Sequence, residues 1–355
     1  MKKNSINKLT PIFVLLFLIV FPIKGMSQTA PPPNRIPFST NSSHLTIWNG
    51  NEFVPFFLKG MNFGIAIPGT FPSELAATRS DYARWFRQIK DAGFNAIRLY
   101  TLHFPRFYEV LDSFNRANPQ NPLLFIQGVW LEEELYGYPK DLKWLTPSFR
   151  NEIKENIDAI HGNRTIASRR GKAYGNFRTD VSRWCLAFII GREIHGIEVA
   201  RTDSIHAGVN RFIGNHFGIE NASPSEVWAT QMLDYTVSHQ QQNYNTQRPI
   251  SMSSWPTLDP LPHPEEQNPD EDLAHIDLSR LQLLNAPAGF FVSYHAYPYY
   301  PNFISWQSSY QGYFDEFGPN SYLGYLTELR NHYPRFPLII AEYGLPSSWL
   351  NAHYS

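Results

Sequence analysis

The chain has 355 residues, with 30 Lys and Arg against 31 Asp and Glu, and 15% of its residues are Phe, Trp or Tyr. A net charge of -1 offers no positive field for phosphates, so nucleic acid is not an expected partner. Aromatic faces stack on sugar rings, which makes a carbohydrate the favoured ligand class. The single cysteine, Cys185, excludes an intrachain disulfide, so the protein must be stabilised by its core.

Residues 1–27 have the pattern of a signal peptide. Lys2, Lys3 and Lys8 are followed by a mostly apolar run over residues 9–23, and small residues precede a cleavage point before Gln28. A membrane anchor is the alternative, but the run is short for a span and two prolines interrupt it. We expect an exported protein, periplasmic or extracellular, with no membrane contact after the signal is removed.

Residues 28–44 contain a proline run and are predicted as a linker, followed by one catalytic domain over residues 45–355. This domain opens with a predicted β-hairpin, in which Asn49 and Gly50 supply the turn.

Apolar strands then alternate with helical stretches. The predicted strands cover residues 56–63, 96–101, 123–130, 185–191, 249–255, 290–297 and 337–344, and the clearest helices cover 80–93, 225–245 and 320–333. Alternation of this kind predicts a parallel sheet with covered faces. The first strand lacks the GxGxxG turn of a doubly wound fold, and polar or aromatic residues follow nearly every strand. The pattern therefore favours a (β/α)8 TIM barrel, in which active sites are built at the carboxyl ends of the strands.

The count of barrel strands is seven, one fewer than a closed barrel needs. A missing strand would leave two edges with unpaired backbone groups. We therefore expect the sequence to be C-terminally incomplete, with an eighth strand in the natural protein.

Two glutamates, Glu193 and Glu342, each end an apolar strand. A buried carboxylate is costly unless it is paired or is reached by water or a ligand. Two such carboxyls suit retaining glycoside hydrolysis, which needs one as nucleophile and the other as acid and then base. The alternatives are a salt bridge of Glu193 with Arg192 or with another Arg at a strand end, and Glu198 as the acid in place of Glu193.

Five motifs, in order along the chain, resemble the large clan of retaining β-glycosidases on (β/α)8 barrels, which includes cellulase-like, β-galactosidase-type and glucanosyltransferase-like families. They are FFLKGMNFG, DAGFNAIRLYT, FIIGREI, VSYHAY and IIAEYG. The resemblance implies that Glu193 is the acid/base, that Glu342 is the nucleophile, and that Arg98 lies near it. Clan members usually have Asn before the acid/base, where this chain has Arg192, which adds a positive charge and could recognise an acidic sugar.

Further substrate-binding candidates are His295, Tyr297, Trp130 and Trp255. His295 and Tyr297 would lie beside the nucleophile, and the two tryptophans would form sugar platforms. The alternatives are a rim-supporting Arg98, a core role for His295, loop packing for Tyr297, and tryptophans that only fill the barrel rim.

No cofactor or metal is expected, because the chain has no HExxH, CxxC, GxSxG or P-loop pattern. The long acidic, proline-rich segment over residues 256–277 is predicted to be a lid or a disordered insert. Taken together, the sequence predicts an exported glycoside hydrolase acting on a β-linked glycan. The alternatives are a transglycosylase on the same barrel and a non-catalytic carbohydrate-binding barrel.

Overall fold

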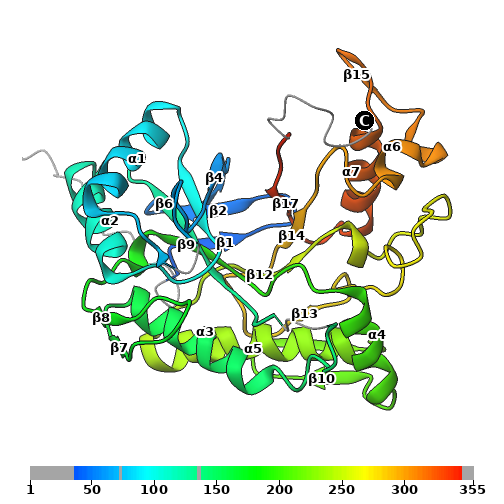
Figure 1. Ribbon diagram of the computed structural model, residues 1–355, viewed down its shortest axis with the longest axis horizontal. Helices are drawn as coiled ribbons and strands as arrows, with labels where there is room; N and C mark the ends of the chain where they lie inside the picture. The colour runs from blue at the N-terminus through cyan, green and yellow to red at the C-terminus, as the bar shows by residue number, and fades with distance from the viewer. Residues whose placement is uncertain (1–35, 72–73, 134–136, 346–355) are drawn as a thin grey trace, which may run out of the picture.

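The computed structural model describes residues 36–71, 74–133 and 137–345, so the predicted signal peptide lies outside the described residues. Its centre is a seven-stranded parallel sheet that curls into a nearly closed barrel, with helices packed around it (Figure 1). Within the described part of the chain, no helix has the length and apolarity to cross a membrane.

All seven predicted barrel strands are confirmed, and with them the barrel fold. Each strand pairs in parallel with its neighbours, in chain order. They are β4 (Gly60–Phe63), β5 (Ala96–Leu99), β6 (Leu124–Val129), β9 (Cys185–Ile190), β12 (Ile250–Ser254), β14 (Val292–His295) and β17 (Leu338–Glu342). Within the described residues, β4 and β17 are the two ends of this sheet and are not paired with each other, so the barrel is incomplete.

The strands between the two ends of the sheet are deeply buried. Every residue of β6 and β9 is buried, as expected for parallel strands covered on both faces. Helices pack outside them: α1 (Arg79–Asp91), α2 (Pro105–Ala117), α3 (Thr146–Ile160), α4 (Gly196–Ile205), α5 (Pro224–Tyr244), α6 (Phe303–Trp306) and α7 (Ser321–His332). The helices predicted over 80–93, 225–245 and 320–333 are α1, α5 and α7. In α1, Tyr82, Phe86 and Ile89 form the buried stripe that helical periodicity requires.

The N-terminal segment forms a small antiparallel sheet of β1 (Phe38–Thr40), β2 (Leu45–Trp48) and β3 (Phe53–Phe56). The predicted hairpin is β2 and β3, and Gly50 has a φ of 101° in its turn. The linker prediction is wrong for its described part, because β1 lies inside residues 28–44. Ile36 and Phe38 are buried, and this apolar contact holds the segment against the barrel.

Short strands in the loops were not predicted, because two to four residues carry little periodicity. They are β7 (Arg164–Ile166), β8 (Gly175–Phe177), β10 (Arg211–Ile213), β11 (Phe217–Glu220), β13 (Gln282–Leu283), β15 (Phe314–Asp315) and β16 (Gly318–Pro319). The acidic segment after β12 is packed against the protein. The carboxylate of Asp259 is buried and accepts a hydrogen bond from the Tyr325 hydroxyl of α7 at 2.8 Å.

Candidate active site

Glu193 and Glu342 come together at the carboxyl end of the barrel, as predicted from their positions at strand ends. Glu342 is the last residue of β17, and Glu193 lies just beyond β9. His295, the last residue of β14, lies between them. One oxygen of each glutamate and a ring nitrogen of His295 all lie within 4.8 Å of one another. Two carboxyl groups therefore share one small site.

Glu342 is held by three side chains, one from β5 and two from the end of β14. Arg98 of β5 donates from Nη1 to Glu342 Oε1 at 3.2 Å, and the Tyr297 hydroxyl donates to Oε2 at 2.6 Å. His295 Nδ1 lies 3.4 Å from Oε1. Only 14% of the Glu342 side chain is exposed, so these contacts act in a poorly solvated setting.

The environment of Glu342 favours its ionised form. Burial by itself raises the pKa of Glu342, but His295, Tyr297, Arg98 and Tyr100 together outweigh it, and the pKa is lowered from its ordinary value. Tyr297 responds in the opposite direction. Burial first, and then its hydrogen bond to Glu342, raise the pKa of Tyr297, so that it remains a protonated donor. Glu342 is therefore a carboxylate at neutral pH.

Glu193 has a more open environment. Its side chain is 41% exposed, and its Oε1 lies 2.8 Å from His295 Nδ1. His295 is buried, and its Nε2 lies 3.2 Å from the Ser253 hydroxyl of β12. When Nε2 accepts from Ser253, Nδ1 carries the proton and can donate to Glu193. Glu193 thus has one fixed partner and one side open for a substrate.

Arg192 does not take the predicted substrate-binding position. Its side chain is only 1% exposed, and its guanidinium donates to both carboxylate oxygens of Glu198, at 3.0 and 2.8 Å. Glu198 is equally buried, which also rules against it as the acid/base. The alternative salt bridge of Arg192 with Glu193 is wrong as well. The sequence pattern missed the partner because Glu198 lies on the first turn of α4, beyond the loop that follows Glu193.

The two predicted sugar platforms differ in how they are held. Trp255, after β12, is half-buried and donates from Nε1 to the Ile194 carbonyl at 2.9 Å, so it supports the loop that carries Glu193. Trp130 is half-buried at the end of β6. A role in stacking on a sugar remains a prediction for both.

Tyr100 and Ser253 are the residues that sequence reasoning missed. Tyr100 helps to lower the pKa of Glu342, and its ring centroid lies 4.5 Å from the Arg98 guanidinium. A signal was available, because side chains two residues apart along an extended chain point the same way. Tyr100 stands in that relation to Arg98, just as Tyr297 does to His295.

Glu193, His295 and Glu342 have the right atoms for a metal ion. However, the oxygens of Glu342 already accept bonds from Arg98 and Tyr297, and the Arg98 cation would repel a divalent ion at this distance. We interpret the group as a hydrogen-bonded carboxyl pair.

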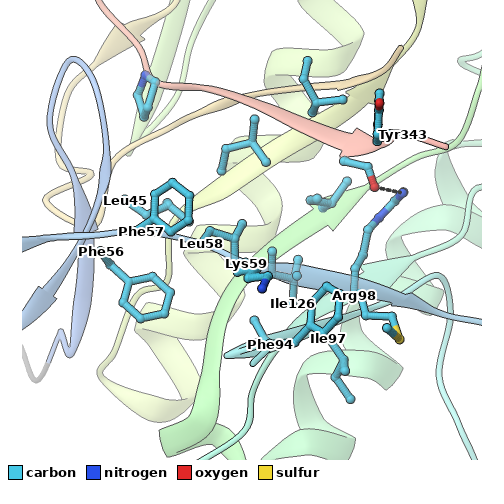
Figure 2. A pocket seen from close by; sticks show the side chains of 18 of the residues that line it. Leu45, Phe56, Phe57, Leu58, Lys59, Phe94, Ile97, Arg98, Ile126 and Tyr343 are labelled. Atoms are coloured by element: carbon cyan, nitrogen blue, oxygen red, sulfur yellow. Dashed lines mark hydrogen bonds between the residues drawn. The ribbon is translucent and has the colours of Figure 1, made fainter. Parts of the chain in front are cut away.

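A cavity of about 760 Å³ lies beside this site, in the seam between β17 and β4. Figure 2 shows apolar side chains around it, including Leu58, Ile97 and Ile126, with Arg98 and Tyr343 at one end. The same Arg98 donates from Nη1 to the Ala341 carbonyl of β17 at 3.2 Å. The seam therefore reaches the residue that holds Glu342.

No protein-family model matches the chain, and no curated protein sequence matches it. Solved structures with a similar fold include β-glucuronidase 2 of Bacteroides uniformis, at 14% identity and a TM-score of 0.46 over 88% of this chain. An endo-laminarinase of Formosa Hel1_33_131 shares 9% identity, with a TM-score of 0.45 over 81% of this chain. An FMN-binding β-glucuronidase of Faecalibacterium prausnitzii shares 13% identity, with a TM-score of 0.42 over 86%.

The chain spans 27% and 33% of the two β-glucuronidase chains and 66% of the laminarinase chain. At these identities the likeness concerns the fold alone. The seven parallel strands, in a nearly closed barrel with helices between them, are the architecture of an incomplete TIM barrel.

Proposed function

We propose that this protein is a glycoside hydrolase that cleaves β-glycosidic bonds by a retaining mechanism, with Glu342 as nucleophile and Glu193 as acid/base. The observation that carries the proposal is the close approach of the two carboxyl groups, which have oxygens within 4.8 Å of each other. Retaining enzymes place the pair about 5–5.5 Å apart, whereas inverting enzymes need about 6.5–9.5 Å to admit a water.

The first step uses the two glutamates at once. Protonated Glu193 gives its proton to the glycosidic oxygen, while a Glu342 oxygen attacks the anomeric carbon. The bond between the anomeric carbon and the leaving group breaks, and a covalent glycosyl ester of Glu342 forms. The ionised state of Glu342, held by Arg98 and Tyr297, supports its part in this step.

The second step reverses the roles. Ionised Glu193 takes a proton from water, whose oxygen attacks the anomeric carbon and releases the Glu342 carboxylate. The 41% exposure of the Glu193 side chain supports this role, because both the leaving group and the incoming water must reach it. The same chemistry with a sugar hydroxyl in place of water would be transglycosylation.

The substrate in this proposal is a β-linked oligo- or polysaccharide, met outside the cytoplasm after export. Trp130 and Trp255 are the side chains we propose for stacking on its sugar rings, a contact worth on the order of 1 kcal/mol each.

The test is a screen of β-linked glucans, mannans, galactans and xylans, followed by trapping. A 2-fluoro glycoside of the best sugar, with a good leaving group, forms the ester but hydrolyses slowly. We expect mass spectrometry to find the label on Glu342 in wild type and no label in Glu342→Gln. A label on another residue, or a product of inverted anomeric configuration, would overturn the assignment.

A further inference from the structure

A buried ion pair lies directly behind Glu193, and the proposed chemistry does not use it. Arg192 and Glu198 meet through two hydrogen bonds, and each side chain is 1% exposed. Burying two charges costs desolvation free energy, and apolar residues of similar volume at such positions often give a protein that is equally stable. Because Arg192 is the residue next to the proposed acid/base, we looked to Glu193 for the role of this ion pair.

The pair fixes the backbone that follows the Glu193 side chain. Arg192 Nη1 donates to the Glu193 carbonyl at 2.9 Å, and the His195 amide donates to Glu198 Oε2 at 3.1 Å. Between them, Trp255 Nε1 donates to the Ile194 carbonyl at 2.9 Å. Three successive residues after β9 are thus each held by a side chain. Without these bonds the loop would have several conformations, and the Glu193 carboxyl would not be confined to one place.

The pair also determines the charge that Glu193 meets. A guanidinium is always ionised, and next to a carboxyl it favours loss of the carboxyl proton. An acid catalyst needs the opposite, because it must hold its proton until the leaving group takes it. Glu198 places a full negative charge against Arg192 in a site that water does not screen, so the pair is neutral from the outside.

We propose that Glu198 is a positioning residue for Glu193, which neutralises Arg192 and, through it, fixes the loop that carries the acid/base. The inference rests on the proposed function, since it concerns the same reaction. It also gives the Arg at the position before the acid/base a partner of opposite charge.

Other groups also bear on Glu193, and they stay constant in the experiment below. His295 of β14 contacts it directly, and Glu342 of β17 lies beyond His295. Among the described residues, the titratable or charged groups near it also include Arg98, Tyr100, Tyr297 and Tyr300, Glu266 and Glu271 near Tyr300, His195, and Tyr138 with Glu133, where the Tyr138 ring centroid lies 4.2 Å from that of His195.

The experiment compares two variants that both break the ion pair. Glu198→Gln leaves the Arg192 charge uncompensated, whereas Arg192→Gln/Glu198→Gln leaves no charge. We expect the basic limb of the kcat/KM profile to move to lower pH by about 1 unit or more in the single variant. In the double variant it should return toward its wild-type position, although kcat stays low because the loop is released. A purely structural pair predicts the same limb in both variants, and that result would overturn the proposal.

A second readout does not depend on activity. Carbon-13 in the glutamate side-chain carboxyls reports their titration by NMR, and Glu193→Gln identifies the signal of Glu193. In Glu198→Gln, that carboxyl should lose its proton at lower pH than in wild type. If this shift occurs but no glycan is cleaved, the proposed function fails while the electrostatic role stands. If Glu198→Gln does not fold, Glu198→Asp should give a smaller shift of the same sign, and an unchanged titration there would refute the role of Glu198.

Discussion

The strands β9 and β17 both lead an apolar run into a glutamate, yet they hold it in different ways. β9 lies in the middle of the sheet, hydrogen-bonded to β6 and β12, and all six of its residues are buried. β17 lies at an end of the sheet and pairs with β14, and all five of its residues are only partly buried. Glu193 after β9 is positioned by bonds to the backbone that follows it and by one side-chain partner, His295, whereas Glu342 is positioned by several bonds to its side chain.

Arg98 supplies β17 with hydrogen bonds on the side where this end strand has no neighbouring strand in the described structure. It reaches from β5 to the Ala341 carbonyl and the Glu342 carboxylate, each at 3.2 Å, and so connects β17 to the other part of the sheet near the seam. Its Nε, by contrast, is buried and has no hydrogen-bond partner among the described residues. A glutamate at a sheet edge thus depends on a few long side chains, while one in the middle of the sheet depends on many backbone contacts.

The largest expected effect separates the two glutamates. Glu342→Gln should lower kcat by about 10³-fold or more on every substrate, because it removes the proposed nucleophile. In Glu193→Gln, activity should fall most on substrates with poor leaving groups, because a good leaving group needs no proton. Azide should rescue Glu193→Ala and give a β-glycosyl azide, as measured by product NMR. Equal activity of Glu342→Gln and wild type would refute the roles.

Arg98→Met tests whether β17 depends on a single side chain. We expect kcat to fall by about 10²-fold, because the charge that holds Glu342 ionised is lost. The thermal midpoint should fall as well, since the Ala341 carbonyl loses its partner. Arg84→Met, at an exposed pair with Asp81, is the matched control and should change neither. An unaltered kcat in Arg98→Met would show that Glu342 is held by its strand after all.

Tyr297→Phe tests, through the pH dependence of kcat, how far Glu342 depends on bonds to its side chain. The pKa of Glu342 is lowered in the folded protein, so its ionised form contributes stability above its unfolded pKa, and this is lost as pH falls through the folded pKa. Without the Tyr297 bond, the folded pKa rises toward the ordinary value. The acid limb of the kcat profile should therefore move to higher pH, while the basic limb stays in place. Tyr299→Phe, at the neighbouring ring, is the control, and an acid limb at the wild-type pH in Tyr297→Phe would contradict the role of this bond.

The smallest effect concerns association of the chain. The seam exposes backbone edges and apolar side chains of β17, and such edges pair with one another. We expect the 355-residue chain to associate on a sizing column in a concentration-dependent way and to be weakly active. Ile340→Lys should reduce the association, whereas Ile189→Val, inside buried β9, should not. A monomer with a normal rate of hydrolysis would show that the seam is harmless.

Much of this molecule could be predicted because its strands are short apolar runs with clear ends. The seven strands, the hairpin over β2 and β3, and the helices α1, α5 and α7 all follow from periodicity. The strand β1 was missed because the proline run before it is typical of a linker. The helices α2, α3 and α4 and the short loop strands also went unpredicted.

The sequence by itself predicted that Glu193, His295 and Glu342 lie at or just beyond strand ends, and therefore at one end of a parallel barrel, while the resemblance implied that Arg98 lies near Glu342. Strand periodicity is local, so it can be recognised from the order of neighbouring residues alone. Only the tertiary structure decided the pairing of their side chains. Arg192 bonds Glu198 rather than Glu193 or a ligand, because a loop and the first turn of α4 bring that carboxylate into the buried space behind the strand. Such a contact depends on how the loop folds back, which residue spacing does not encode.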